Sequence, residues 1–179
     1  MNEFCIETPR LLLRAWKSGD RDAFRTFVSD SEMMRFITAG KVWEERQIDE
    51  FFERQARNMN EGGYCMGAVV LKEAGEVIGV AGIQPHRLAG DDEIGWWIGP
   101  SFQRQGFASE IGAACLRYGL DVLKRQRIVA IADPENAASI RVMEKIGMRY
   151  LDTVSARSLE ARYPDELVVR YVAGEKAKS

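Results

Sequence analysis

The turn at residues 103–109 has the residue types best suited to binding a ligand. It reads Q-R-Q-G-F-A-S, follows the apolar run at 93–98 and leads into a pattern typical of a helix. Backbone N–H groups at the start of a helix lack intrahelical partners and carry partial positive charge. Gly106 allows close approach to the backbone, and Arg104 adds a positive charge. We therefore predict a phosphate or pyrophosphate site here, with an ordinary strand-to-helix turn as the alternative.

A second block, at residues 127–148, reads R-I-V-A-I-A-D-P-E-N-A-A-S-I-R-V-M-E-K-I-G-M. Apart from Arg127, its first six residues are apolar and β-branched or small, which predicts a buried strand over 127–132 that ends at the D-P pair. Asn136 is a favourable N-cap, residues 137–146 have helical periodicity, and Gly147 is a favourable C-cap. The block therefore predicts a strand, a helix and a new strand that begins at Met148.

In order and spacing, these motifs resemble the GNAT superfamily of acetyl-CoA-dependent N-acetyltransferases. The resemblance rests on Q-x-x-G-x-A after E-I-G-W-W-I, and then on D-P-E-N-A-A-S-I-R-V-M-E-K-I-G-M. The opening T-P-R-L-L-L-R-A-W at residues 8–16 and the ending E-K-I-G-M resemble the branch that contains the RimJ and RimL ribosomal-protein acetyltransferases. The resemblance covers residues 7–171 and implies that acetyl-CoA is the co-substrate, with no metal.

The resemblance also implies where the cofactor lies. Backbone N–H groups of the turn would hold its pyrophosphate. A backbone N–H at Trp97 or Ile98 would polarise the thioester carbonyl, where the family's strands splay apart and admit the pantetheine arm. Asn136 would bond the pantetheine amide, act as an N-cap, or do both. The residues expected to bind the cofactor are Trp97, Ile98, Gln103, Arg104, Gln105, Gly106, Phe107, Ala108, Ser109, Asn136 and Ser139.

Two residues are candidates for moving protons. The attacking amine must be neutral, and Glu93 lies where many family members carry an acid, so it is the candidate base, directly or through water. Asp91 or Asp92 could take its place, and a plain solvent-facing carboxylate is the alternative. Many relatives protonate the departing thiolate with a tyrosine, but residues 137–147 contain none. Ser139 is the remaining hydroxyl, as a catalytic acid or as a helix residue that only bonds the backbone or the cofactor.

Several further side chains are weaker candidates. His86 is the only histidine, and because the sequence lacks a G-x-S-x-G elbow we expect it in a loop rather than in a triad. Trp96 and Trp97 are expected to divide between the core and the cofactor face, because neighbours in a strand point in opposite directions. Arg141 and Lys145 share a helix face that either meets the adenosine phosphate or is simply solvated.

Composition narrows the class of protein. The chain has 179 residues, of which 46% are hydrophobic and 29% charged, as expected for one soluble domain over residues 1–179 with a flexible tail at 174–179. The net charge of −2 gives no electrostatic case for nucleic-acid binding. Three widely spaced cysteines favour a reduced, cytoplasmic compartment over a disulfide framework or a zinc site. No apolar run is long enough to span a membrane, and the N-terminus does not read as a signal peptide.

Hydrophobic periodicity predicts a mixed α/β (α+β) fold, similar to that of the GNAT superfamily. One mixed, mostly antiparallel central sheet of about seven strands is expected to be flanked by helices. Strands are predicted at 10–16, 64–72, 77–84, 92–98, 127–132, from 148 onward and at 166–172. Helices are predicted at 20–28, 31–36, 44–59, 109–123 and 137–146.

The sequence as a whole predicts an N-acetyltransferase that moves an acetyl group from acetyl-CoA to a primary amine, with a protein or peptide N-terminal α-amine as the expected acceptor. Direct attack in a ternary complex is expected, because no cysteine lies in a nucleophile motif. Acetylation of a small-molecule amine (antibiotic, polyamine or amino acid) and non-catalytic acetyl-CoA binding are the alternatives. Phe36, Trp43 and Phe51 either line the acceptor pocket or pack in the core. Exposed strands and aromatic surface are compatible with a homodimer.

Overall fold

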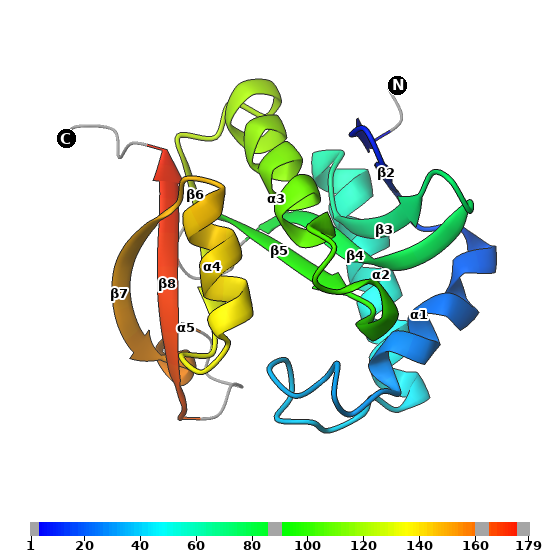
Figure 1. Cartoon of the computed structure of the whole chain (residues 1–179), viewed down its shortest axis with the longest axis horizontal. Helices are drawn as coiled ribbons and strands as arrows, with labels where there is room; N and C mark the ends of the chain where they lie inside the picture. The colour runs from blue at the N-terminus through cyan, green and yellow to red at the C-terminus, as the bar shows by residue number, and fades with distance from the viewer. Residues whose placement is uncertain (1–3, 86–90, 160–164, 175–179) are drawn as a thin grey trace.

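One mixed, mostly antiparallel sheet organises the chain, as the computed structural model in Figure 1 shows. The structure describes residues 4–85, 91–159 and 165–174. Within these ranges, eight strands follow the order β1-β2-β3-β4-β5-β6-β8-β7, and the pair β5–β6 is parallel. The strands are β1 (Cys5–Glu7), β2 (Leu11–Arg14), β3 (Met66–Leu71), β4 (Glu76–Pro85), β5 (Asp92–Ile98), β6 (Arg127–Ala132), β7 (Arg149–Ser155) and β8 (Leu167–Gly174).

Helices cover both faces of the sheet. They are α1 (Arg21–Val28), α2 (Glu45–Gly62), α3 (Phe107–Arg117), α4 (Ala137–Lys145) and α5 (Ala156–Leu159), together with the short turns η1 (Ser18–Asp20), η2 (Pro100–Phe102) and η3 (Tyr118–Val122). Helix α3 packs against β4, β5 and α4, whereas α1 packs against β4 from the opposite face (Figure 1).

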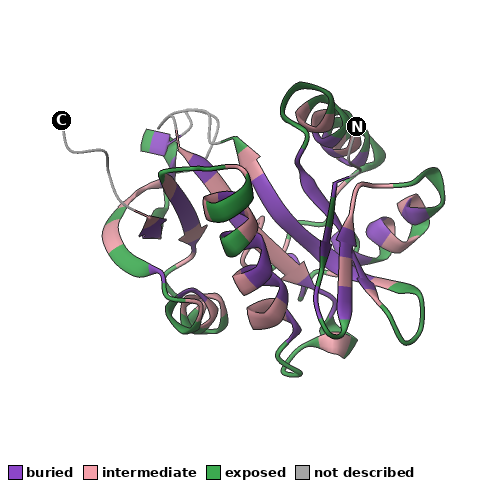
Figure 2. Ribbon diagram, turned by 90° about the horizontal axis from the view of Figure 1, so that it is seen from above, coloured by how far each residue is buried: buried purple, intermediate pink, exposed green. Residues whose placement is uncertain are grey.

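Each face buries its own hydrophobic core. The core under α3 and α4 contains Ile94 and Ile98 of β5, with Ile111 of α3. The core under α1 and α2 contains Phe24 and Phe51. Figure 2 shows the buried residues running through the sheet and along the inner sides of the helices. This separation follows from the pleat, which sends alternate side chains of a strand to opposite faces.

Most of the predicted strands are present in the structure. The hairpin expected from 64–72 and 77–84 is the antiparallel pair β3–β4, and the strands at 92–98 and 127–132 are β5 and β6. The sheet has one strand more than predicted: the strand expected at 10–16 is β2, and β1 at Cys5–Glu7 was not predicted. The Thr8 N–H donates to the carbonyl oxygen of Leu11 at 2.9 Å, which closes a tight turn and folds β1 back onto β2.

The helix predicted at 31–36 is wrong, because this segment is a series of turns. The carbonyl oxygen of Met34 accepts from the N–H groups of Ile37, Thr38 and Gly40. One acceptor therefore closes three overlapping turns, and the regular series of helical hydrogen bonds does not continue. Gly40 has a φ of +79°, outside the helical region. So short a segment does not offset the free energy of helix nucleation.

The helix predicted at 109–123 begins earlier and ends differently. Helix α3 starts at Phe107, directly after Gly106, and continues from Tyr118 as the π-helical turn η3. The Leu123 N–H donates to the carbonyl oxygen of Tyr118 at 3.0 Å, which is the spacing of a π-helix. A Cβ on Gly119 would lie 2.3 Å from Ile128 Cδ1, so a larger residue at this position would force the Ile128 side chain of β6 to move.

The C-terminal strand is longer than predicted, because β8 extends to Gly174, the first residue of the expected tail. The remainder of that tail, 175–179, and His86 lie outside the described residues. Among the helices in the described ranges, none is both long enough and apolar enough to cross a bilayer.

Candidate active site

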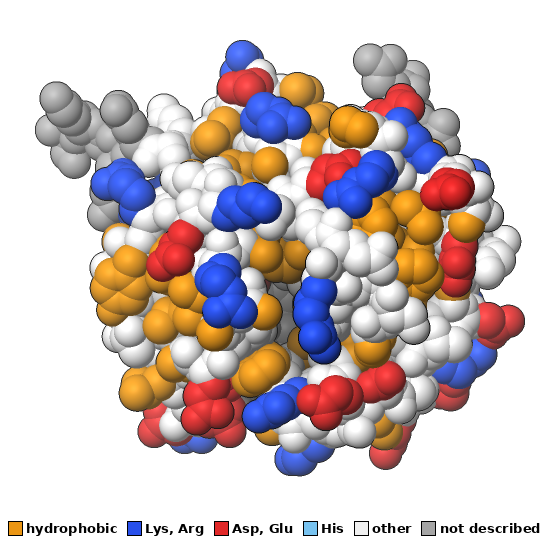
Figure 3. Space-filling model, viewed as in Figure 1, with side chains coloured by type: hydrophobic (Ala, Val, Ile, Leu, Met, Phe, Trp, Pro, Cys, Tyr) orange, Lys and Arg blue, Asp and Glu red, His pale blue; other side chains and the backbone are white. Residues whose placement is uncertain are grey.

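A pocket of about 510 Å³ lies between α4 and the turn that joins β5 to α3. Figure 3 shows the corresponding hollow near the middle of this face, with Lys and Arg side chains on both sides. Residues from four segments line the pocket: 32–37, 96–109, α4, and Asn136 before it. Of the residues expected to bind the cofactor, those that line it are Trp97, Ile98, Gln103, Arg104, Gly106, Phe107, Ala108, Ser109, Asn136 and Ser139.

The turn before α3 has the backbone shape of an anion site. Arg104 has a φ of +59° and Gly106 a φ of +81°, so left-handed residues alternate with right-handed or extended ones. Such alternation gathers N–H groups into a concave nest. The first intrahelical bond of α3 runs from the Glu110 N–H to the carbonyl oxygen of Gly106 at 3.0 Å. The N–H groups of residues 107–109 therefore have no intrahelical partner and can serve a phosphate.

Strands β5 and β6 diverge beside this turn. Between the described residues of the two strands, the parallel register contains Asp92 with Ile128 and Glu93 with Val129, and no later pair. Both strands continue, β5 to Ile98 and β6 to Ala132. A gap therefore opens between them toward the pocket, at the place where the resemblance implied that the strands splay apart.

The pleat decides which N–H groups of β5 face this gap. The Gly99 N–H donates to the carbonyl oxygen of Ile78 at 2.9 Å, so the polar groups of Gly99 point toward β4. In an antiparallel ladder this direction alternates, so Trp97 also points toward β4 and Ile98 points into the gap. The carbonyl oxygen of Ile98 is consistent with this direction, because its partner is a side chain and not β4: it accepts from Gln103 Nε2 at 3.0 Å.

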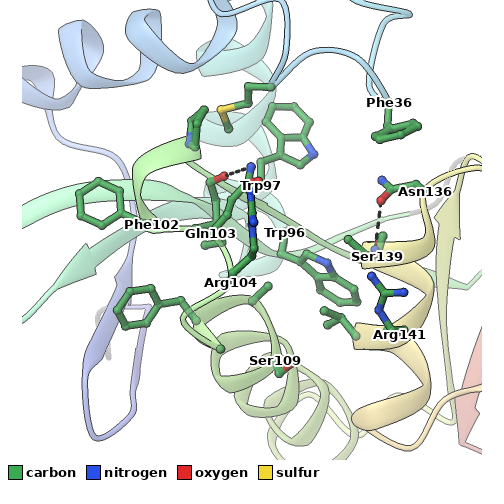
Figure 4. Close-up of a pocket in the computed structure, with 18 of the residues that line it drawn as sticks. Phe36, Trp96, Trp97, Phe102, Gln103, Arg104, Ser109, Asn136, Ser139 and Arg141 are labelled. Carbon is green, nitrogen blue, oxygen red and sulfur yellow. Dashed lines mark hydrogen bonds between the residues drawn. The ribbon is translucent and has the colours of Figure 1, made fainter.

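The start of α4 supplies polar groups on the other side of the pocket. Asn136 is the N-cap, and its Oδ1 accepts from the Ser139 N–H at 3.1 Å. Its NH₂ group donates to no other described residue. The Ser139 hydroxyl makes no hydrogen bond with another described residue. Figure 4 shows Asn136 and Ser139 on the side of α4 that faces Trp96.

The charges that line the pocket are mostly positive. Arg104 lies on the turn, and Arg141 and Lys145 lie one helical turn apart on α4. Of the pocket-lining residues that the structure describes, Glu32 is the only acid, and it pairs with Arg35 at 3.6 Å on the exposed rim. The pocket is therefore electrostatically suited to a phosphorylated ligand.

Glu93 lies away from this pocket. It is half-buried on β5, and Gln84 Nε2 is 3.4 Å from its Oε2. It shares the face of Trp97, because the two residues are an even number of positions apart. A strand rises about 3.3 Å per residue, which places the Cα atoms of Glu93 and Ile98 about 16 Å apart. Glu93 is therefore too far from Ile98 for direct contact with a group bound beside Ile98.

Neither neighbouring aspartate is free to replace Glu93. Asp92 is 8% exposed, and its carboxylate accepts from Tyr64 Oη at 3.1 Å and from Arg125 Nε at 2.6 Å. Burial and the adjacent Asp92 carboxylate raise the pKa of Tyr64. Asp91 pairs with Arg127 at 3.3 Å, and both side chains are largely buried. These carboxylates hold the start of β5 in place.

The aromatic candidates divide between pocket and core. Trp96 packs toward α3 and lies 3.2 Å from the position that a Cβ on Gly112 would occupy. Trp97 packs on the other face, with ring centroids 5.9 Å from Trp43 and 6.1 Å from Phe51. Both tryptophans line the pocket, and so does Phe36, whereas Trp43 and Phe51 belong to the core under α1 and α2.

Comparison with known proteins agrees with this geometry. The acetyltransferase (GNAT) domain family matches residues 10–149. The chain belongs to the GNAT acetyltransferase family. The uncharacterized N-acetyltransferase YnaD from Bacillus subtilis (strain 168) is 37% identical over 145 residues, which are 80% of this chain and 82% of YnaD.

Two solved GNAT enzymes share the fold at lower identity. RimL, a ribosomal L7/L12 α-N-protein acetyltransferase in complex with coenzyme A, is 19% identical with a TM-score of 0.76, over 95% of this chain and 97% of RimL. The spermidine N-acetyltransferase from Vibrio cholerae, in complex with CoA and spermine, is also 19% identical with a TM-score of 0.72, over 93% of this chain and 96% of that one.

The chain is thus an acetyl-CoA-dependent N-acetyltransferase, and its own residues fit the co-substrate. The nest of N–H groups and the cations suit the phosphates, and the gap between β5 and β6 can admit an extended arm. In the described ranges, no group of three or more His, Cys, Asp or Glu side chains is placed to hold a metal ion.

Sequence reasoning missed two parts of the GNAT site. The first is most of the segment 32–37: Phe36 was a candidate for the acceptor pocket, but the other pocket-lining residues of the segment were not predicted, because its turns carry no motif. The second is Arg10, whose Nη1 donates to the carbonyl oxygen of Gln105 at 3.0 Å. The T-P-R-L opening resembles one branch of the family, but nothing in that motif says what Arg10 contacts. Gln105 itself does not line the pocket, and its side chain donates to the carbonyl oxygen of Ser101.

Proposed function

We propose that this GNAT enzyme acetylates the N-terminal α-amine of a protein or peptide, by direct attack of the amine on the thioester in a ternary complex. The observation that carries the choice of acceptor is the charge of the described pocket. Arg104, Arg141 and Lys145 line it, against Glu32 alone. Such a lining attracts the phosphates of the co-substrate and does not gather a polycation.

The chemistry of the acceptor points the same way. An α-amine has a pKa near 8, so about one in ten is neutral at pH 7, whereas about one in 2,500 lysine amines is neutral. Glu93 is separated from Ile98 by most of β5 and acts through water. At that distance the carboxylate lies beyond one-water reach of an amine beside Ile98. This favours an acceptor that is partly neutral already, as an α-amine is, over a lysine or polyamine amine.

The roles of the residues follow from the directions of their polar groups. We assign the phosphates to the backbone N–H groups of the 103–109 turn, supported by Arg104. The Ile98 N–H, which points into the gap, donates to the thioester carbonyl oxygen and stabilises the charge that develops there. Glu93 receives the amine proton through water. The Ser139 hydroxyl donates a proton to the departing thiolate, and the Asn136 NH₂ group holds the pantetheine amide.

The acceptor is tested by locating the acetyl group in a peptide that offers both kinds of amine. The peptide carries a free N-terminus and one internal lysine, and its product is sequenced by tandem mass spectrometry. The proposal expects acetyl on the α-amine alone. Acetyl on the lysine, or loss of acetylation only when the lysine is replaced by arginine, would contradict it.

A small-molecule amine is the second candidate, and one observation favours it. Phe36, Trp96 and Trp97 line the pocket, and aromatic faces attract ammonium groups. The spermidine enzyme also shares the fold. A panel of spermidine, amino acids and aminoglycosides, compared with the peptide at equal concentration, decides between the two. Faster release of CoA with a small amine than with the peptide would replace the peptide assignment.

We also propose a cytoplasmic location and one acetyltransferase domain over residues 1–179. The location is supported by the cysteines in the described ranges, which are free: Cys65 and Cys115 are buried, and Cys5 is exposed. Labelling the protein in intact cells with a membrane-impermeant thiol reagent would test the location, because a cytoplasmic Cys5 stays unlabelled until the cells are lysed.

A further inference from the structure

The Arg10 side chain joins the start of β2 to the turn before α3. Its Nη1 donates to the carbonyl oxygen of Gln105 at 3.0 Å, and its guanidinium carbon lies 4.3 Å from the centroid of the Phe107 ring. Its Nη2 lies 3.5 Å from the position that a Cβ on Gly106 would occupy. Arg10 therefore contacts Gln105 and Phe107 and lies beside Gly106, the residue between them.

Glu110, in the first turn of α3, holds Arg10 in place. Its Oε2 accepts from Arg10 Nε at 2.7 Å, and its Oε1 accepts from the Arg10 backbone N–H at 3.0 Å and from the Thr8 hydroxyl at 2.7 Å. The Glu110 side chain is 17% exposed. Burial alone would raise the pKa of Glu110, but the hydrogen bonds from Thr8 and Arg10 lower it overall. The carboxylate is therefore a charged anchor for Arg10.

The contact with Gln105 sets the direction of the next N–H group. In a trans peptide the carbonyl oxygen of Gln105 and the N–H of Gly106 point in opposite directions. Arg10 holds that oxygen on the side of β2, and Gln105 does not line the pocket, whereas Gly106 does. Gly106 has a φ of +81° and glycine admits many conformations, so without this contact the peptide plane is free to turn over.

We propose that Arg10 is a positioning residue for co-substrate binding: by holding the Gln105 carbonyl oxygen, it keeps the Gly106 N–H aimed into the site for the pyrophosphate. This inference rests on the proposed role of the turn. Arg10 acts through the backbone of the turn, and its guanidinium adds positive charge behind it.

The test compares two ligands that share the acetyl and pantetheine groups. Acetyl-CoA carries the pyrophosphate, and S-acetyl-pantetheine does not. Dissociation constants for both are measured by calorimetry with the wild type, R10A and R10K. The matched control is R46A, which removes another exposed arginine with an ion pair, to Glu50 at 3.4 Å, on α2. Wild type should bind acetyl-CoA much more tightly than S-acetyl-pantetheine.

The inference expects R10A to weaken acetyl-CoA binding about tenfold or more, with S-acetyl-pantetheine binding unchanged. R10K should recover little, because lysine lacks the planar fork with which arginine bonds Glu110 through Nε and the Gln105 carbonyl oxygen through Nη1. Turnover at saturating acetyl-CoA should stay near the wild-type value, so the effect appears in KM rather than in kcat. R46A should behave as the wild type.

Other outcomes overturn the inference in distinguishable ways. Equal weakening of both ligands in R10A would show that Arg10 only supports the fold, and full recovery in R10K would show that charge alone matters. A wild type with no preference for acetyl-CoA would remove the role of the turn itself, and this inference with it. If R10A does not fold, E110Q is tested instead, because it keeps Arg10 but removes its charged anchor. E110Q should then weaken the binding of acetyl-CoA by less than about tenfold and leave the binding of S-acetyl-pantetheine unchanged. Unchanged acetyl-CoA binding in E110Q would contradict the inference.

Discussion

The side-chain amide of Gln103 donates to the carbonyl oxygen of Ile98 at 3.0 Å, across the turn at the end of β5. This contact holds the last residue of the strand at the point where β5 has left β6. Because the Ile98 N–H points into the same gap as its carbonyl group, Gln103 fixes the direction of the N–H that we assign to the thioester oxygen.

Replacing Gln103 by methionine is expected to lower kcat about tenfold, because a loosened oxyanion donor stabilises the transition state less. The dissociation constant for acetyl-CoA should change much less than kcat. Gln47→Met is the matched control, because Gln47 also makes one side-chain bond to a backbone group, accepting from the Glu44 N–H at 3.0 Å, but at the start of α2. Steady-state kinetics of both variants check the prediction, and an equal loss in the control would contradict it.

Gly106→Ala and Gly75→Ala form a second matched pair. Gly106 has a φ of +81° and Gly75 a φ of +67°, and an added Cβ at either position meets no atom closer than 3.5 Å. Each substitution is expected to destabilise the fold by about 1 kcal/mol, because alanine is strained in the left-handed region. Only Gly106→Ala should also weaken acetyl-CoA binding, by about tenfold, since Gly75 lies in the β3–β4 turn. Urea unfolding and calorimetry separate the two effects, and equal acetyl-CoA binding by the two variants would contradict the assignment.

The sequence predicted those parts of the site that depend on local backbone chemistry. The anion turn, the N-cap at Asn136 and the strand before the turn are short patterns whose geometry follows from nearby residues. Contacts between residues far apart in the sequence could not be predicted. Arg10 and Glu110 lie 100 positions apart, and only the folded chain shows that they meet.

The stability of the fold should depend on the ionisation of Glu110. Because hydrogen bonds from Thr8 and Arg10 outweigh the opposing effect of burial, the pKa of Glu110 in the folded state lies below 4.5. A carboxyl group with a lowered folded-state pKa adds stability above its unfolded-state value, and this stability is lost as pH falls through the folded-state value. The free energy of unfolding of the wild type, relative to Glu110→Gln, should therefore decrease as the pH falls from neutral to acidic values below 4.5. If the difference in free energy of unfolding between the two proteins did not change with pH, the ionised Glu110 would not stabilise the fold.

The cysteines should differ sharply in reactivity. Burial raises the pKa of Cys65 and of Cys115 to about 12, so neither forms much thiolate in the folded protein. Cys5 is exposed. A thiol reagent at pH 8 should label Cys5 alone in the native protein and all three cysteines after unfolding. Cys5→Ser should abolish native labelling, and rapid native labelling of Cys115 would show that α3 is less tightly packed than the structure has it.

The same variant tests the order of chemical steps. If acetyl passes directly to the amine, Cys5→Ser keeps full activity and initial-rate plots against the two substrates intersect. Parallel lines, or an acetyl group found on any cysteine, would indicate a covalent intermediate on the enzyme and contradict direct attack.

The errors in the predicted fold have physical causes. Residues 31–36 have helical periodicity, but the three turns that share the Met34 carbonyl oxygen replace a helix, because propensity over so short a segment is outweighed by nearby contacts. The π-helical turn after α3 depends on the approach of Gly119 to Ile128 in β6, and no local pattern encodes the distance between a helix and a strand.

Release of free CoA thiol from acetyl-CoA tests the central claim most directly. The wild type and Gly106→Glu are compared with a peptide that has a free N-terminus and with the same peptide after N-terminal blocking. The wild type should release CoA only with the free peptide, and Gly106→Glu should release none, because a carboxylate in the turn excludes the pyrophosphate. Release by Gly106→Glu at the wild-type rate, or equal release with the blocked peptide, would contradict the assignment of this turn and of the α-amine acceptor.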